Sequence, residues 1–490
     1  MMKAKRALAF LVAVMTAAAI TGCGSSDSSS GTSAAGTDAE STNEYDLGSH
    51  EDAVSVTDTE TIASMDTIPD SEKELIWLSY FDINPTRSSP ETRTDLDLFQ
   101  KKGGKIIYDK TQSLEKYTKL AQEILAGSPP DMFWFEKKMT FPYNVTRGMF
   151  QSIDSIVDFD SDLWKDTKDD AEEYVLNGQH FVAPIRYVTT SVITYDKDVM
   201  EAAELDDPYT LWQEGKWNWN TWYDMMAEYV NNAPDDEQRY GVNGWFAPFI
   251  FYSTGKSLIM FDKEKQEYYN NIDDSDFIRV TDMLYDIKKN GFYLNEWRGQ
   301  TEDAFTDHVL FYAMGPWASI DSHTPKEGDR WAMVPLPSDP NSDKNYIYPD
   351  IEAYMWVAGS KKDVAMKTWL ECARIVNTDE QYKQVEREKF FTTNPNWTDE
   401  MYYVAYELLG TDYYTCITDP GFGVNTDISD DDAALNDSKE AVNSYMYTSV
   451  MKESEDGEQF TWTQLKESYR DIIDKGVSEI NELYKEFMTK

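Results

Sequence analysis

The sequence predicts an α/β fold in which mostly parallel sheets are flanked by helices. Near the start of the folded part, β-favouring runs at 75–81, 105–108 and 131–135 alternate with helical patterns at 95–100 and 114–126. Strands joined through helices by short links pair in parallel with right-handed crossovers. Further along, Val309–Met314 is an uncharged apolar run, which is the pattern of a buried strand.

The helix predicted at 114–126 is the clearest of these elements. Tyr117, Leu120 and Ile124 fall on one face, as in an amphipathic helix packed on a sheet. Ser113 is placed to cap the start of the helix, and Gly127 is placed to end it.

The middle of the chain continues the pattern. Apolar runs at 181–185 and 191–195 predict two strands. A helix is expected at 216–230, with Trp222, Met225, Met226 and Tyr229 as a core stripe. The remaining expected elements are a strand and turn at 240–253, a strand at 331–337 stopped by prolines, a segment at 346–360, a helix at 363–376, and a mainly helical tail at 377–490 with an acidic loop around 430–432.

The amino terminus has the pattern of an export signal. Lys3, Lys5 and Arg6 precede an uncharged run at 7–20, which is short for a membrane span. The residues up to Cys23 resemble a bacterial lipobox, so residues 1–22 are predicted to be a lipoprotein signal peptide and Cys23 to carry the lipid that anchors the chain to a membrane. Residues 23–72 lack Lys and Arg and are predicted to be a disordered acidic tether.

The overall composition narrows the classes of partner. The formal charge of -44 makes nucleic acid an unsuitable partner. After the amino terminus, no apolar run is long enough to cross a membrane. A disulfide between Cys372 and Cys416 is one alternative. The favoured interpretation is that Cys372 is a packed thiol on the apolar side of a helix.

Polar and aromatic residues gather at the predicted strand ends, where ligands bind in parallel sheets. The end of the first strand carries Tyr80 and Asp82, and the end of the third carries Trp134 and Glu136. Trp317 follows the Gly-Pro break after the run at 309–314, so it is delivered at the end of a strand.

Several short motifs occur in a fixed order, at 126–131, 178–184, 195–198, 220–222, 314–317, 334–337 and 358–360. In this order, behind a lipobox, they resemble the bacterial ABC-importer solute-binding proteins of the large family that includes the maltose-binding protein. The resemblance covers most of residues 73–380.

The resemblance implies a two-lobed periplasmic-binding-protein-like fold of type II, with each lobe a mostly parallel sheet flanked by helices. It implies a first lobe of residues 73–188 plus 335–390 and a second of 189–334 plus 391–490. The hinge crossings are expected near 187–190 and 334–338. Such a protein would be a lipid-anchored monomer on the outer face of the cytoplasmic membrane that passes its ligand to the transmembrane permease subunits.

A carbohydrate is the ligand that the residues favour, because aromatic rings cover the C–H face of a sugar and charged groups pair its hydroxyls. Aromatic residues make up 14% of the chain. Position and family similarity give the expected platforms Trp134, Trp245, Trp317 and Trp356, and the expected polar contacts Tyr80, Asp82, Glu136, Arg186 and Asp350. Neither a catalytic residue nor a metal or cofactor is expected.

Two departures from the family pattern leave the sugar undefined. Asp307-His308 stands where the family has Gly-Lys, and Thr189-Thr190 stands near the position of an acidic residue in some maltose-type proteins. The alternatives are an exported glycan-acting enzyme with two positioned carboxylates, and a binding protein for ferric iron, a polyamine or a peptide. The adjacent tyrosines at 268–269, 402–403 and 413–414 are the pattern that would suit iron.

Overall fold

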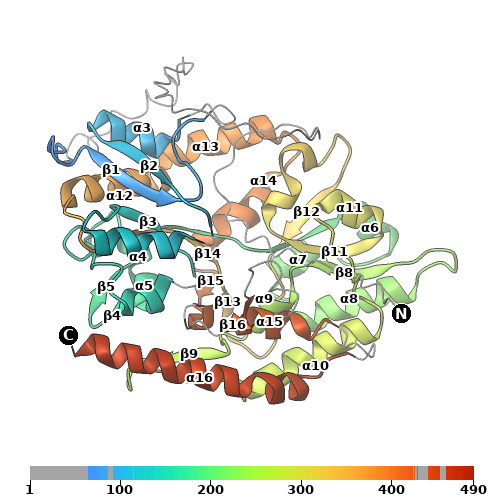
Figure 1. The fold of residues 1–490 in the computed structure, drawn as a ribbon. Coiled ribbons are helices and arrows are strands. Elements are labelled where there is room, and N and C mark those ends of the chain that lie inside the picture. Colours follow the sequence, from blue (N-terminus) through green and yellow to red (C-terminus); the bar gives the residue numbers. More distant parts are fainter. Residues whose placement is uncertain are drawn as a thin grey trace, which may run out of the picture.

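The computed structural model describes residues 65–86, 92–113, 115–137, 140–422, 424, 427–428, 440–452 and 459–489. Within these residues the molecule is organised around two separate sheets (Figure 1). The signal peptide, Cys23 and the acidic loop around 430–432 lie outside the described residues.

The first sheet has five strands in the order β2-β1-β3-β14-β6. β1 pairs in parallel with β2 and β3, whereas β14 is antiparallel to both β3 and β6. The predicted parallel strands are therefore confirmed, with one reversed strand inserted among them. The strands are β1 (Glu74–Ser79), β2 (Lys105–Lys110), β3 (Met132–Trp134), β6 (Ala183–Val188) and β14 (Asp350–Trp356).

Helices cover both faces of this sheet because neighbouring strand residues point to opposite sides. Trp77 belongs to a core cluster with Phe99 of α3 (Thr94–Lys101) and Trp369 of α12 (Asp363–Thr378). Leu78 belongs to another cluster, with Leu120 of α4 (Lys116–Ala126). Helices on both faces make the sheet a buried layer.

Helix α4 ends where the sequence predicts, but its amino-terminal cap differs from the prediction. Gly127 follows the helix with φ 76°, the left-handed conformation that glycine adopts without strain. The predicted cap at Ser113 is wrong: Glu115 occupies the capping position, without a side-chain hydrogen bond. The Ser113 hydroxyl instead accepts a 3.4 Å hydrogen bond from Lys116.

The second sheet has four strands in the order β12-β7-β11-β8. All six residues of β11 are buried, as its uncharged sequence predicts. β8 and β11 run parallel, and β7 is antiparallel to β11 and β12. The strands are β7 (Val192–Asp196), β8 (Tyr240–Gly244), β11 (Val309–Met314) and β12 (Trp331–Val334).

Helix α8 (Trp219–Asn231) packs on β8 with the stripe predicted from its sequence. Trp222, Met225, Met226 and Tyr229 are all buried. The segment after β8 differs from the prediction, because residues 247–252 form the short helix α9 (Ala247–Tyr252) in place of an extended turn.

The chain passes between the two sheets more than once. It leaves the first sheet after β6 and enters the second at β7, and it returns between β12 and β14. Residues just after β12 still pack with the second sheet: the Trp217 indole donates to Pro335 O at 2.7 Å, and Arg279 contacts Asp339 at 2.7 Å. The second crossing therefore lies after Asp339, later than the expected 334–338.

The folded part begins earlier than the predicted residue 73. Ile68 is 2% exposed and belongs to the first core. The Glu72 carboxylate accepts hydrogen bonds from the Val364 and Ala365 amides at the start of α12. Residues 65–72 are thus packed on the first sheet's helices and are not part of a tether.

The carboxyl-terminal helix α16 contacts elements next to both sheets. Helix α16 (Trp462–Met488) runs along the lower side of the molecule from α10 (Ser275–Lys289) toward the short strands β4 (Val175–Leu176) and β5 (Gln179–His180) (Figure 1). It packs on β10 (Glu267–Asn270), where Asn481 exchanges two 2.8 Å hydrogen bonds with the Tyr268 backbone. Near its other end, Phe487 contacts Phe181.

Both cysteines in the part of the chain that the structure describes are free thiols. Cys372 is buried on α12, as the packed-thiol interpretation predicts, and Cys416 is half-buried in β15 (Tyr414–Cys416). Burial raises the pKa of Cys416 to about 12, so its thiol remains protonated at neutral pH.

Candidate functional site

The carboxyl ends of the parallel strands β1, β3 and β6 meet at one edge of the first sheet, where β14 begins. The structure brings together at this edge most of the site residues predicted in the first part of the chain. They are Tyr80, Asp82, Trp134, Glu136, Arg186 and Asp350.

Trp134 lies half-buried at the end of β3. Its ring meets Tyr354, Phe81 and Trp77 edge-on, with centroid separations of 5.1, 6.0 and 6.3 Å. Edge-to-face contacts of this kind hold an indole in one orientation. Part of the ring is covered by the core and part remains accessible.

Tyr80 and Glu136 are joined through a lysine that the sequence interpretation missed. Lys116, at the start of α4, lies 2.6 Å from Glu136 and 5.0 Å above the Tyr80 ring. The Tyr117 hydroxyl donates to Glu136 at 3.3 Å, and burial raises the pKa of Tyr117 well above its ordinary value. The charge of Glu136 is therefore balanced by Lys116, which lies between this carboxylate and the Tyr80 ring.

Arg186 forms a two-pronged ion pair with Glu352, its partner across β6 and β14, at 2.8 and 2.7 Å. Desolvation lowers the pKa of Arg186, but the charge of Glu352 and its hydrogen bonds outweigh that effect, and the pKa is raised. The Arg186 side chain is 45% exposed and that of Glu352 15%. The arginine is thus fixed by its partner and still open to solvent.

A second arginine–carboxylate pair stands beside the first. Arg93 and Asp95, at the start of α3, are joined by hydrogen bonds of 3.0 and 2.6 Å. The charges of both act on Tyr354, whose pKa is raised chiefly by burial. Neither residue nor Glu352 was predicted, because their contacts depend on strand register and on the placement of α3, which local sequence does not reveal.

Asp82 and Asp350 have mainly local partners. Asp82 accepts hydrogen bonds from the Asn84 amide and side chain at 2.9 and 2.8 Å, which fixes the turn after β1. Asp350 is 54% exposed and lies 2.8 Å from Lys137. The Lys137 ammonium stands 3.7 Å from the centre of the Tyr348 ring, so the Asp350 carboxylate belongs to an organised group.

The second sheet contributes two of the predicted tryptophans. β8 and β11 run parallel and lead at their carboxyl ends to Trp245 and Trp317. Both rings are half-buried against one small core cluster. A Cβ on Gly315 would lie 2.2 Å from the Trp317 indole nitrogen, so only glycine lets this ring lie on the backbone before Pro316. The cluster comprises Leu294, Ala304, Val309, Tyr312, Met314 and Ala318.

Residues 397–406 lie next to the segment that follows Trp317. The Trp397 indole donates to Ser319 O at 2.7 Å and stacks on Tyr406 with centroids 6.0 Å apart. Burial raises the pKa of Tyr406, and the charges of Arg186 and Asp321 also act on it. Residues 403–407 lie against β12 and residues 408–410 lie against β6, so this part of the chain contacts both sheets.

Trp356 does not fit the predicted platform. It is 7% exposed and packs in the first core, since β14 lies between two other strands and has covered faces. We therefore leave Trp356 out of the candidate site.

The sequence interpretation also missed an accessible tryptophan beside Trp245. Trp297 is 57% exposed, and its ring centroid lies 6.0 Å from that of Trp245. A tryptophan between Glu296 and Arg298 in a polar loop was the available signal, because a core indole seldom has charged neighbours on both sides.

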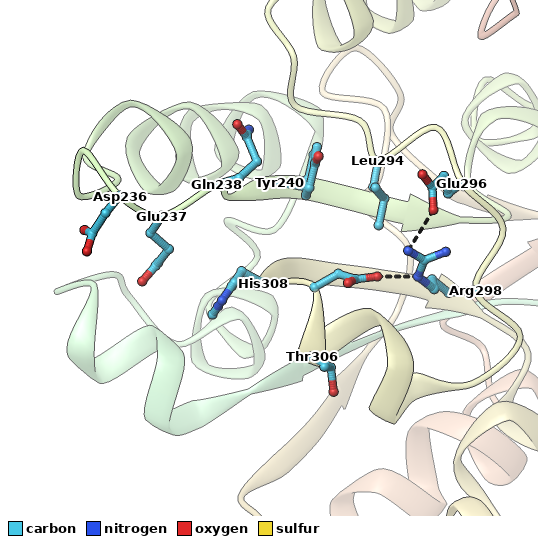
Figure 2. A pocket seen from close by; sticks show the side chains of 10 residues that line it. Asp236, Glu237, Gln238, Tyr240, Leu294, Glu296, Arg298, Thr306 and His308 are labelled. Atoms are coloured by element: carbon cyan, nitrogen blue, oxygen red, sulfur yellow. Dashed lines mark hydrogen bonds and ion pairs between the residues drawn. The ribbon is translucent and has the colours of Figure 1, made fainter.

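A groove of about 510 Å³ extends from the starts of β8 and β11 to the loop that carries Trp297. Figure 2 shows His308 and Glu237 at one end of it and Glu296 and Arg298 at the other. Arg298 is held by Glu296 and Asp307. The lining contains none of the predicted site residues, and it comprises Asp236, Glu237, Gln238, Tyr240, Leu294, Glu296, Arg298, Thr306, Asp307 and His308.

The described residues contain no group of three or more His, Cys, Asp or Glu side chains suited to hold a metal ion. Tyr268 and Tyr269 alternate on β10: Tyr268 is 5% exposed, whereas Tyr269 is 39% exposed, so the two phenols do not converge. Across the part of the chain covered by the structure, no helix is both long and apolar enough for a membrane span.

The comparison with solved structures identifies the fold. The sugar-binding protein MalE from Xanthomonas citri is 12% identical with a TM-score of 0.55, covering 84% of this chain and 98% of that one. The galacto-N-biose/lacto-N-biose I-binding protein of Bifidobacterium longum, solved with lacto-N-biose, is 12% identical with a TM-score of 0.54 and covers 84% and 97%. The GacH receptor of Streptomyces glaucescens is 15% identical with a TM-score of 0.52 and covers 82% and 98%.

At these identities the structural likeness establishes the fold alone, which is the two-lobed α/β fold of periplasmic binding proteins, as predicted. A search of curated proteins found no match. The model of the bacterial extracellular solute-binding proteins matches residues 89–374, more than half of the 490 residues. The chain therefore belongs to the bacterial extracellular solute-binding protein family.

Proposed function

We propose that this protein is the lipid-anchored receptor of an ABC importer, which captures a carbohydrate between its two lobes and delivers it to a membrane permease. In this proposal Cys23 carries the lipid, the protein works as a monomer on the outer face of the cytoplasmic membrane, and it catalyses no reaction. The lobes are those expected from the sequence, residues 73–188 plus 335–390 and 189–334 plus 391–490, except that residues 65–72 join the first and residues 335–339 join the second.

The observation that carries the proposal is that flat rings stand at the carboxyl edges of both sheets, with a fixed pair of charges beside them at the first edge. Trp134 and the Arg186–Glu352 pair stand at the first edge, and Trp245 and Trp317 stand at the second. Residues 403–407 lie against β12 and residues 408–410 lie against β6, which supports placing the two lobes around one ligand.

Carbohydrate suits these groups for physical reasons. A pyranose presents a C–H face that an indole can cover, while its hydroxyls need donors and acceptors. The Arg186 guanidinium is already oriented by Glu352, so a hydroxyl bound there gains a charge-assisted hydrogen bond without further ordering of that side chain.

Capture requires that the ligand bind the closed form better than the open form. A sugar that touches both lobes stabilises closure by the difference in its contacts between the two forms. The permease can then distinguish loaded receptor from empty receptor by shape.

The experiment is a thermal-shift screen of the soluble part of the chain, followed by calorimetry with the best ligands. The panel contains mono- and oligosaccharides, polyamines, peptides and ferric iron. We expect a saccharide to raise the melting temperature and the other classes to leave it unchanged. Shortened saccharides after incubation would instead show a glycan-acting enzyme, and a colour change with ferric iron would show a metal carrier.

Replacing Trp317 tests the site itself. Trp317→Ala removes a half-buried indole at the second edge, and we expect it to weaken saccharide binding by at least about tenfold, since a stacked aromatic contact contributes on the order of 1 kcal/mol or more. Circular dichroism checks that the variant is folded, and Trp356→Phe in the core is the control expected to bind like the parent. Parental affinity in Trp317→Ala would remove Trp317 from the site.

A further inference from the structure

Trp297 stands out among the described residues as a tryptophan that is more than half exposed, at 57%. Its ring lies 6.0 Å from that of Trp245, and the two planes meet at 58°. The two indoles therefore form an open corner at the carboxyl edge of the second sheet, beyond the half-buried face of Trp245.

The loop that carries Trp297 is firmly held. The Asn243 side chain, only 1% exposed, donates to Leu294 O and Glu296 O, each at 2.8 Å. The Tyr312 hydroxyl, from the buried strand β11, donates to Arg298 O at 2.6 Å. Backbone carbonyls on both sides of Trp297 are thus fixed to the sheet, so the exposed indole is held in place by its loop.

Charged residues flank Trp297 along its loop. Arg298, the next residue, lies 2.9 Å from Glu296 and is also bonded to Asp307, so its guanidinium is held in place by two carboxylates. The exposed indole plane matches the C–H face of one sugar ring.

A protein partner matches this surface less well. The other exposed large apolar side chains of the described residues are on different elements and do not extend the patch; they are Leu125, Tyr269, Ile278, Ile472 and Met488. A specific protein interface needs a contiguous area of several hundred Å² on each side, which one indole does not supply.

We propose that Trp245 and Trp297 form an additional subsite that binds a further pyranose ring of an oligosaccharide, next to the site around Trp317. This inference rests on the proposed function and adds to it that the ligand is an oligosaccharide whose length the subsite selects. Trp297 contacts the outer ring by stacking, with Trp245 at its side.

The test is calorimetry with a series of saccharides of one linkage, from one ring to six, using the sugar type that the thermal-shift screen identifies. In the parent protein, affinity rises when the chain becomes long enough to reach Trp297. In Trp297→Ala that gain falls by about tenfold or more, while the affinity for the shorter members is unchanged. Trp297→Phe restores part of the gain because it keeps a flat ring.

Leu125→Ala is the matched control, since it removes another exposed apolar side chain, 88% exposed, from the first lobe. It is expected to bind every saccharide like the parent. The variant Trp317→Ala weakens all members of the series, whereas Trp297→Ala weakens only the long ones, so the two sites are distinguished.

Parental affinities in Trp297→Ala across the whole series would overturn the subsite and leave the proposed function standing. If the parent binds the single sugar ring as tightly as the longest saccharide, the subsite is likewise overturned and the proposed function stands. If the parent binds no saccharide at all, the proposed function falls and the subsite with it.

Discussion

Asp419 is the residue whose environment most clearly links structure to pH. Its carboxylate is buried and accepts hydrogen bonds from the Tyr252 hydroxyl at 2.8 Å, the Gly421 amide at 2.9 Å and the Asn443 amide at 2.6 Å. Burial raises the pKa of Asp419 to about 6, although these donors oppose the shift. The folded protein therefore holds this proton more tightly than the unfolded chain does.

The sign of the resulting pH dependence follows from linkage. The protonated Asp419 carboxyl contributes its whole share of the unfolding free energy below the ordinary pKa of 3.8. That contribution is lost as the pH rises through about 6, and the total loss is roughly 3 kcal/mol. We expect the difference in unfolding free energy between the parent and Asp419→Asn to fall from pH 4 to pH 7, measured by urea denaturation.

The control is Asp282→Asn, on the exposed side of α10, which removes a carboxylate from an open position. Its difference from the parent is expected to stay nearly constant over the same pH range. A constant difference for Asp419→Asn as well would contradict the assigned pKa.

At the scale of elements, Arg374 joins α12 to two other parts of the first lobe. It is 2% exposed and donates to Leu163 O at 3.1 and 3.0 Å, to Ile185 O on β6, and to Asp166. One guanidinium thus satisfies carbonyls that would otherwise be buried without partners.

Arg374→Met should therefore destabilise the protein by about 3 kcal/mol, because it leaves the Leu163 and Ile185 carbonyls unpaired. Lys367→Met on the same helix, where the lysine is 39% exposed beside Glu371, should cost less than about 0.5 kcal/mol. Chemical denaturation measures the unfolding free energy of both variants. Equal losses would show that the hydrogen bonds of Arg374 do not stabilise the contact of α12 with the rest of the first lobe.

Element types were largely predictable because they depend on local periodicity. The stripe of α8 and the uncharged run of β11 are examples in which sequence spacing alone decides the buried face. The site was less predictable: Arg186 finds Glu352 only through the β6–β14 register, across 166 positions of sequence. For the same reason Trp356 was misjudged, since its burial depends on which strands flank β14.

At the scale of the whole molecule, the proposed mechanism predicts a change of shape. The chain crosses between the sheets at 189–191 and again before β14, so closure would rotate one lobe against the other about these segments. We expect the saccharide that raises the melting temperature to reduce the radius of gyration in small-angle X-ray scattering.

The same measurement on Trp317→Ala should show no contraction at saccharide concentrations that saturate the parent. Identical scattering of the parent with and without a bound saccharide would contradict closure as the signal read by the permease, even if binding itself is confirmed by calorimetry.

The insertion of β14 between β3 and β6 also constrains the order of folding. During synthesis the first lobe waits for a central strand that emerges only after the whole of the second sheet, because β14 begins at Asp350 and β12 ends at Val334. Until then β3 keeps an unpaired edge and β6 has no partner strand in this sheet, and unpaired edges are sites for aggregation. This long-range pairing implies slow maturation and a nascent chain that depends on chaperones for longer than one whose lobes follow each other in sequence.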